Sequence, residues 1–229
     1  MVWIKICGIT NIYDAKKISD LGADALGFVL STESLRRISE KKAEEIITEL
    51  KDYCLSTDKK VPFMVGVFVN EKVEKIVNFI KKKLFDLIQF SGDEEPEYLN
   101  AIKKYNKSIK IIKAIRVSTG VSKYPESDSI TSIFKMILPF KESADFFLMD
   151  TLKKGIYGGT GKSYNWDYLK DFGNNFPVII AGGLDADNVG RAIEIIKPFG
   201  VDASSRLEEH PGKKDIKKTE DFFNAVRSV

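Results

Sequence analysis

The stretch that decides the fold is Trp3-Ile4-Lys5-Ile6-Cys7-Gly8-Ile9-Thr10, close to the N-terminus. Its first five residues, Trp3–Cys7, are typical of a short apolar strand, and the glycine after them permits a tight turn. Thr10 or Asn11 can then cap a following helix. The thiol of Cys7 is therefore expected where a strand becomes a loop, which is the catalytic face of a parallel α/β barrel.

Strand-like and helix-like stretches alternate along the whole chain. We expect strands over Trp3–Cys7, Asp24–Leu30, Pro62–Val69, Phe85–Phe90, Ser108–Ile115, Asp145–Asp150, Pro177–Ala181 and Val201–Ser204. Helical patterns follow them over Ile12–Leu21, Ser39–Lys51, Glu71–Lys83, Glu94–Tyr105, Ile130–Leu138, Trp166–Phe172, Ala186–Lys197 and Ile216–Val229. The strands are continuous apolar runs, which suit a parallel sheet buried on both faces.

Eight strand–helix units in a chain of this length predict an α/β fold, a closed (β/α)8 TIM barrel with eight parallel strands. The alternative is a doubly wound open sheet, which usually carries a glycine-rich phosphate loop after its first strand. This chain has a single glycine there, so the barrel is favoured. No linker or low-complexity segment divides the 229 residues, and we expect one domain over 1–229.

Composition excludes several classes of function. The formal net charge is +3, from 36 basic and 33 acidic side chains. This near balance gives no overall excess of basic residues that would indicate a nucleic-acid-binding protein. No apolar run has the length of a membrane span and the N-terminus lacks a signal-peptide pattern, so we expect a cytoplasmic protein. With one histidine, His210, and two cysteines, we expect no metal site.

A carboxylate and a glycine-rich loop follow the sixth expected strand. Asp150 ends the apolar run, a place where a carboxylate is commonly a helix cap or a solvated end. A loop containing Gly158, Gly159, Thr160 and Gly161 comes eight residues later. Loops of this kind can close over a barrel site and exclude water. Together they favour a catalytic carboxylate beneath a lid.

Backbone and hydroxyl donors follow the last two expected strands. Gly182 and Gly183 come directly after the seventh strand, and Ser204 and Ser205 after the eighth. The loops after these strands are the usual phosphate site of such barrels, and exposed N–H groups can bind an anion. A phosphorylated small-molecule ligand is therefore expected. Arg36, on the loop after the second strand, can hold a carboxylate in a bidentate fork or lie exposed.

The chain resembles the phosphoribosylanthranilate isomerase family of tryptophan biosynthesis over nearly its full length. The matching segments occur in the family's order and are Lys5–Thr10, Gly27-Phe28 with 34–38, Val65–Asn70, Ile88–Glu94, Asp150 with Gly158–Lys162 and Asn165-Trp166, Ala181–Leu184 with Asn188-Val189, Val201–Ser205 and Pro211–Asp215. The resemblance implies an Amadori rearrangement of the aminoaldose N-(5-phosphoribosyl)anthranilate to the ketose 1-(2-carboxyphenylamino)-1-deoxyribulose 5-phosphate. It implies no cofactor.

The resemblance also implies roles for individual residues. Asp150 is the general acid that opens the sugar ring, and Cys7 is the general base that takes a proton from the adjacent carbon. Arg36 would bind the anthranilate carboxylate, and Asp202 would contact sugar hydroxyls or serve as a structural carboxylate. The phosphate would bind at Gly182, Gly183, Ser204 and Ser205.

The two catalytic roles require perturbed titration. A free aspartic acid has a pKa near ~3.9 and a free cysteine near ~8.5. We therefore expect desolvation to raise the pKa of Asp150, and cationic or dipolar neighbours to lower the pKa of Cys7. Lys5 is a candidate neighbour, because a spacing of two places it on the same face of the strand as Cys7.

Three positions depart from the family pattern and bear on substrate affinity. Leu35 stands where proline is usual, Ser91 where histidine is usual, and Arg206 where glycine is usual. Two other functions remain open, namely the related aminoaldose isomerase of histidine biosynthesis and a barrel that binds a phosphorylated metabolite without catalysis. The presence of both Cys7 and Asp150 favours the first-named isomerase. Monomer and homodimer are both compatible with the sequence.

Overall fold

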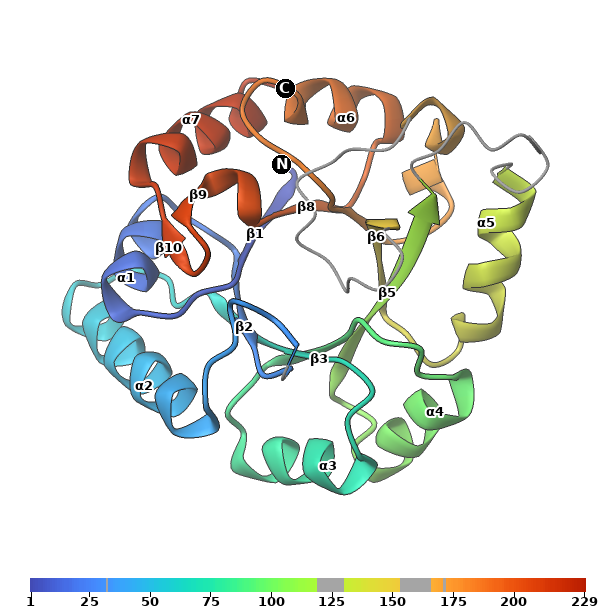
Figure 1. Cartoon of the computed structure of the whole chain (residues 1–229), viewed down its shortest axis with the longest axis horizontal. Helices are drawn as coiled ribbons and strands as arrows, with labels where there is room; N and C mark the ends of the chain where they lie inside the picture. Colours follow the sequence, from blue (N-terminus) through green and yellow to red (C-terminus); the bar gives the residue numbers. More distant parts are fainter. Residues whose placement is uncertain (32, 119–129, 153–165, 171) are drawn as a thin grey trace.

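The computed structural model describes residues 1–31, 33–118, 130–152, 166–170 and 172–229. Eight parallel strands close into a barrel in chain order, with β8 paired to β1 (Figure 1). The strands are β1 (Trp3–Cys7), β2 (Ala25–Val29), β3 (Phe63–Phe68), β4 (Leu87–Phe90), β5 (Lys110–Ser118), β6 (Phe146–Leu152), β7 (Val178–Ile180) and β8 (Gly200–Ala203). The predicted (β/α)8 barrel is confirmed.

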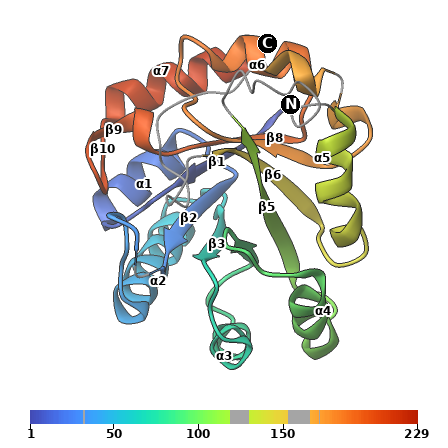
Figure 2. The same ribbon diagram turned by 45° about the vertical axis from the view of Figure 1, so that its right-hand side comes forward.

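Helices surround the barrel on its outside, as the two ribbon views show (Figures 1 and 2). They are α1 (Ile12–Asp20), α2 (Glu40–Ser56), α3 (Val73–Lys82), α4 (Pro96–Tyr105), α5 (Ile130–Ile137), α6 (Val189–Ile196) and α7 (Ile216–Arg227). Asn11 caps α1 by accepting a hydrogen bond from the backbone N–H of Asp14 at 2.8 Å. Within the described ranges, every helix is too short or too polar to cross a bilayer.

Apolar side chains form two layers, one on each face of the barrel wall. The larger layer lies between the strands and the helices, where residues such as Phe28, Phe68 and Phe147 are buried. The smaller layer fills the barrel interior and includes Val65 and Leu148. Burial of both strand faces explains why the sequence shows continuous apolar runs instead of an alternating pattern.

Two segments differ from the sequence-based prediction. The expected helix Trp166–Phe172 is instead a pair of short 3-10 turns, η2 (Trp166–Leu169) and η3 (Phe172–Asn174). Gly173 and Pro177 are poor helix formers and leave too few residues for a stable α-helix. Between the eighth expected strand and the last expected helix, where no element was predicted, the chain forms an antiparallel pair, β9 (Glu208–His210) and β10 (Lys213–Lys214), which lies near α1 in Figure 1.

Strand register sets which side chains meet at the mouth of the barrel. In the β1–β8 pair Lys5 is the direct partner of Asp202, and in the β1–β2 pair Cys7 is the direct partner of Gly27. In the β5–β6 pair Arg116 is the partner of Asp150. The closed topology therefore brings residues almost 200 positions apart in sequence into contact at one end of the barrel.

Candidate active site

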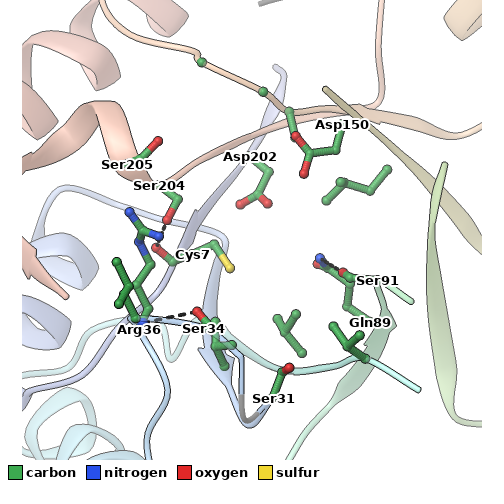
Figure 3. Close-up of a pocket in the computed structure, with 18 of the residues that line it drawn as sticks. Cys7, Ser31, Ser34, Arg36, Gln89, Ser91, Asp150, Asp202, Ser204 and Ser205 are labelled. Atoms are coloured by element: carbon green, nitrogen blue, oxygen red, sulfur yellow. Dashed lines mark hydrogen bonds between the residues drawn. The ribbon is translucent and has the colours of Figure 1, made fainter. Parts of the chain in front are cut away.

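A cavity of about 360 Å³ opens at the carboxyl ends of the strands (Figure 3). Its lining includes all eight of the catalytic and substrate-binding residues expected from the sequence. These are Cys7, Arg36, Asp150, Gly182, Gly183, Asp202, Ser204 and Ser205. The volume lies within the range of small-molecule sites.

Cys7 ends β1 and directs its sulfur atom into the cavity (Figure 3). The residue is only 9% exposed. Its carbonyl oxygen accepts a hydrogen bond from Ser204 Oγ at 3.0 Å, which ties the end of β1 to the loop after β8. A Cβ on Gly27, its partner on β2, would lie 2.7 Å from the sulfur, so glycine at this position makes room for the thiol.

The pKa of the Cys7 thiol is raised above its ordinary value, chiefly because burial disfavours the thiolate. The charges of Lys5 and Lys214 act in the opposite direction, and Asp202 adds to the rise. The expectation of a lowered Cys7 pKa is therefore wrong. The cationic neighbours are present, but desolvation outweighs them.

Asp150 lies across the cavity from Cys7, on β6 (Figure 3). Its side chain is half-buried and lines the same cavity. Acid and base candidates thus come from separate strands of one rigid barrel, which fixes the space between them for a substrate.

A buried ion pair joins β1 to β8 two positions before Cys7. Lys5 Nζ donates a hydrogen bond to Asp202 Oδ2 at 2.8 Å, and the two side chains are 0% and 8% exposed. The second carboxylate oxygen, Oδ1, is buried and has no hydrogen-bond partner among the described residues. Asp202 is also one of the residues that line the cavity.

Arg36 is held in place by a carboxylate from the far end of the chain. Its Nε and Nη2 atoms donate to Oε1 and Oε2 of Glu208 at 2.8 and 2.7 Å. Lys214 Nζ donates to the same carboxylate at 3.0 Å. Burial would raise the pKa of Glu208, but Arg36 and Lys214 outweigh it and hold that pKa below its ordinary value. The arginine is therefore preorganised at the cavity edge.

Gly8 is required for this placement. Its φ of +82° lies in the left-handed region, and a Cβ there would lie 2.6 Å from Cδ of Arg36. Glycine at position 8 thus permits the turn after β1 and, because it has no Cβ, also leaves room for the Arg36 side chain to pass over it.

The predicted phosphate loops lie side by side at the ends of β7 and β8. Gly182 and Gly183 both have positive φ, and Asn188 Nδ2 holds the turn by donating to the Gly183 carbonyl at 2.9 Å. Ser205 begins a short 3-10 turn, η4 (Ser205–Leu207). The two loops place backbone N–H groups and hydroxyls at one edge of the cavity, an arrangement suited to an anion.

The chain is similar in sequence and in fold to the proteins of one enzyme family. The family model for N-(5'phosphoribosyl)anthranilate (PRA) isomerase matches residues 4–225. An N-(5'-phosphoribosyl)anthranilate isomerase of Petrotoga mobilis is 39% identical over 231 residues, covering 100% of this chain and 99% of that protein. The chain belongs to the N-(5'-phosphoribosyl)anthranilate isomerase family. Membership confirms the predicted enzyme class, an isomerase of tryptophan biosynthesis.

Solved structures of this isomerase family have the same fold. The phosphoribosyl anthranilate isomerase of Thermotoga maritima superposes with a TM-score of 0.82 at 34% identity, covering 100% of both chains. A phosphoribosyl anthranilate isomerase in complex with reduced 1-(o-carboxyphenylamino)-1-deoxyribulose 5-phosphate superposes with a TM-score of 0.79 at 33% identity, also over 100% of both chains.

The three departures from the isomerase family pattern all lie at the cavity. Leu35, Ser91 and Arg206 line it. Leu35 is 80% exposed on the loop after β2. Arg206 is half-exposed and pairs with Asp185, on the loop after β7, at 3.5 Å. The expected lid residues Gly158, Gly159, Thr160 and Gly161 lie outside the described residues.

Three residues at or beside the isomerase cavity were not assigned from the sequence. Glu208 and Lys214 support Arg36, and no local pattern indicates a pairing across 172 positions. Gln89, on β4, also lines the cavity. Its Nε2 donates to Ser91 Oγ at 3.0 Å, while its buried Oε1 has no partner in the part of the chain that is described. The position of Gln89 near the end of β4 is the signal that could have placed it.

Proposed function

We propose that this chain catalyses the Amadori rearrangement of N-(5'-phosphoribosyl)anthranilate in tryptophan biosynthesis, with Asp150 as general acid and Cys7 as general base. The observation that carries the assignment is the carboxyl group and the thiol facing one cavity from different strands. An acid and a base held apart on a rigid scaffold can act on different atoms of one bound substrate.

Asp150 performs the first step as a neutral carboxylic acid. It donates its proton to the furanose ring oxygen while the bond from that oxygen to the anomeric carbon breaks. The lone pair of the anthranilate nitrogen forms the Schiff base, and Asp150 is left as a carboxylate.

Cys7 performs the second step as a thiolate. It removes the proton from the sugar carbon next to the Schiff base, and the electrons of that C–H bond neutralise the nitrogen to give an enolamine. Cys7 becomes a thiol, and the enolamine tautomerises to the ketone product. A positioned acid or base contributes on the order of 100- to 10,000-fold to the rate.

The rest of the cavity holds the two ends of the substrate. Glu208 occupies the Nε and Nη2 edge of Arg36, and this leaves the outer Nη1–Nη2 edge to bind the anthranilate carboxylate. The loops at Gly182-Gly183 and Ser204-Ser205 bind the phosphate, and Asp202 Oδ1 accepts a sugar hydroxyl.

The experiment follows anthranilate fluorescence. Substrate is generated in situ from anthranilate and phosphoribosyl pyrophosphate, and its disappearance is measured with wild type, Cys7→Ala and Asp150→Asn. Cys54→Ala is the matched control, because Cys54 is the other cysteine, buried beside Ser19 and away from the cavity.

Rapid turnover by wild type and Cys54→Ala, with losses of about 100-fold or more in both site variants, supports the assignment. Absence of turnover by a folded wild type contradicts it. In that case the aminoaldose of histidine biosynthesis is assayed next, and failure with both substrates leaves a phosphometabolite-binding barrel.

A further inference from the structure

Lys5 occupies an unusual position for a lysine. It lies in the middle of β1, with its side chain inside the barrel and 0% exposed. Positions of this kind in parallel barrels are normally filled by branched apolar side chains, and Val65, Leu87 and Ile112 fill them on other strands here. Burial of an ammonium group carries a large desolvation penalty unless it is paired. The position therefore points to a role beyond packing.

The pairing of Lys5 is fixed by the sheet. Asp202 is its direct neighbour in the β1–β8 register, and Nζ lies 2.8 Å from Oδ2. Burial would lower the pKa of Lys5, but Asp202 and Cys7 outweigh it and raise that pKa above its ordinary value. The ammonium group therefore keeps its proton, and it is a lasting positive charge inside the barrel.

That charge acts on Cys7 as well as on Asp202. Lys5 and Cys7 are two positions apart and share the inner face of β1. Lys5 is the strongest of the groups that favour the thiolate, and burial opposes it. A general base in a buried site needs such a fixed counter-charge, because water cannot solvate the anion there.

We propose that Lys5 is a positioning residue for the general base: its ammonium group orients the Asp202 carboxylate and stabilises the Cys7 thiolate that receives the substrate proton. This inference rests on the proposed role of Cys7. The proton passes from the substrate carbon to the Cys7 sulfur, and Lys5 keeps its three protons throughout. The lysine therefore acts through electrostatics and neither donates nor accepts a proton.

Other charged groups also lie around the Cys7 thiol. Asp202 on β8 disfavours the thiolate, whereas Lys214 on β10 favours it. Asp150 faces the cavity from β6, and Arg36, neutralised by Glu208, lies on the loop after β2. Lys214 forms an ion pair with Glu208 at 3.0 Å, and burial lowers the pKa of Lys214. Of the two lysines near the thiol, Lys5 has the raised pKa and Lys214 the lowered pKa, so Lys5 holds its proton more firmly.

The test titrates the thiol directly. In a Cys54→Ala background Cys7 is the only cysteine, so the rate of its alkylation by iodoacetamide against pH reports the thiolate fraction. Lys5→Gln is expected to move the midpoint upward by about one pH unit or more, which corresponds to a tenfold or larger loss of thiolate at neutral pH. An unchanged midpoint overturns the proposal.

Activity provides a second readout that separates a catalytic effect from a structural one. We expect Lys5→Gln to lower kcat about tenfold or more, in step with the thiolate loss, with a smaller change in KM. Lys60→Gln, at a lysine 71% exposed, is the matched control and leaves both readouts unchanged. The alkylation titration needs no turnover, so it decides the role of Lys5 even where the proposed reaction fails.

A second pair of variants covers the case in which Lys5→Gln does not fold, because it leaves Asp202 buried without its partner. Asp202→Asn and the double variant Lys5→Met/Asp202→Asn both lack the carboxylate and differ only at Lys5. The double variant should show the higher Cys7 midpoint, again by about one pH unit. Equal midpoints in the two variants overturn the proposal.

Discussion

Arg36 and Glu208 form a two-point ion pair, in which Nε donates to Oε1 at 2.8 Å and Nη2 donates to Oε2 at 2.7 Å. The side chains are 14% and 3% exposed, so the pair is largely shielded from water. It joins the loop after β2 to β9. The site therefore takes the orientation of its candidate carboxylate-binding arginine from a hairpin that contributes nothing else to the cavity lining described here.

We predict that Glu208→Gln raises KM about tenfold with little change in kcat. A neutral amide cannot hold both guanidinium atoms, so Arg36 loses its orientation and about 1.4 kcal/mol of substrate binding. Steady-state kinetics with the fluorescence assay measures this. Glu209→Gln is the control, because Glu209 is adjacent and exposed. A Glu208→Gln enzyme that loses kcat at unchanged KM contradicts the prediction.

The lowered pKa of Glu208 also predicts that the stability of the fold changes with pH. Its pKa is lowered in the folded state, because Arg36 and Lys214 outweigh the effect of burial. A lowered carboxyl pKa stabilises the fold at pH values above the unfolded pKa of about 4.3, and this stabilisation is lost as the pH falls through the folded pKa. Wild type should therefore exceed Glu208→Gln in free energy of unfolding at pH 7.

The size of that difference follows from the buried charges. Removal of one partner leaves Arg36 and Lys214 uncompensated, which costs about 3 kcal/mol. Urea unfolding at about pH 7 and again below about pH 4 measures how the difference depends on pH. The difference should shrink at the acidic pH. A difference that stays constant with pH would show that packing, and not the Glu208 carboxylate charge, is responsible.

Gly8→Ala is predicted to damage both stability and substrate binding. A φ of +82° costs an alanine roughly 1–2 kcal/mol. The added Cβ would also lie 2.6 Å from Cδ of Arg36 and displace that side chain. Thermal unfolding should show a lower Tm, and kinetics should show a raised KM. Gly190→Ala is the control, since its Cβ would meet only a side-chain carbon of Val229 at 3.3 Å. Equal KM values for the two variants would contradict the prediction.

The fold was largely predictable from local pattern. Apolar runs marked the eight strands, and the polar or glycine residues after them marked the catalytic end of the barrel. This reasoning placed Cys7 at the end of β1 and Asp150 on β6, in one cavity. It was wrong for Trp166–Phe172, where a helix was expected and the chain forms two short 3-10 turns.

The electrostatics of the site could not be predicted in the same way. A lowered pKa for Cys7 follows from its cationic neighbours alone, whereas the raised value depends on how fully the barrel buries the sulfur. The Arg36–Glu208 pair joins the loop after β2 to β9, across 172 positions of sequence. The raised pKa of Cys7 and the Arg36–Glu208 pair both depend on contacts between segments far apart in the chain. No single segment of sequence indicates either of them.

Arg206 places a cation at the cavity, beside the loops predicted to bind phosphate. Its guanidinium pairs with Asp185 at 3.5 Å at the edge of the phosphate loops, and the side chain is 51% exposed. We expect Arg206→Gly to raise KM about two- to fivefold at low salt with kcat unchanged, because an exposed ion pair with a phosphate contributes up to about 1 kcal/mol. The effect should disappear at high salt, where screening removes it. Kinetics at two ionic strengths measures it, with Lys217→Ala, at an exposed lysine on α7, as the control. A KM that falls in Arg206→Gly would instead show that the arginine crowds the phosphate.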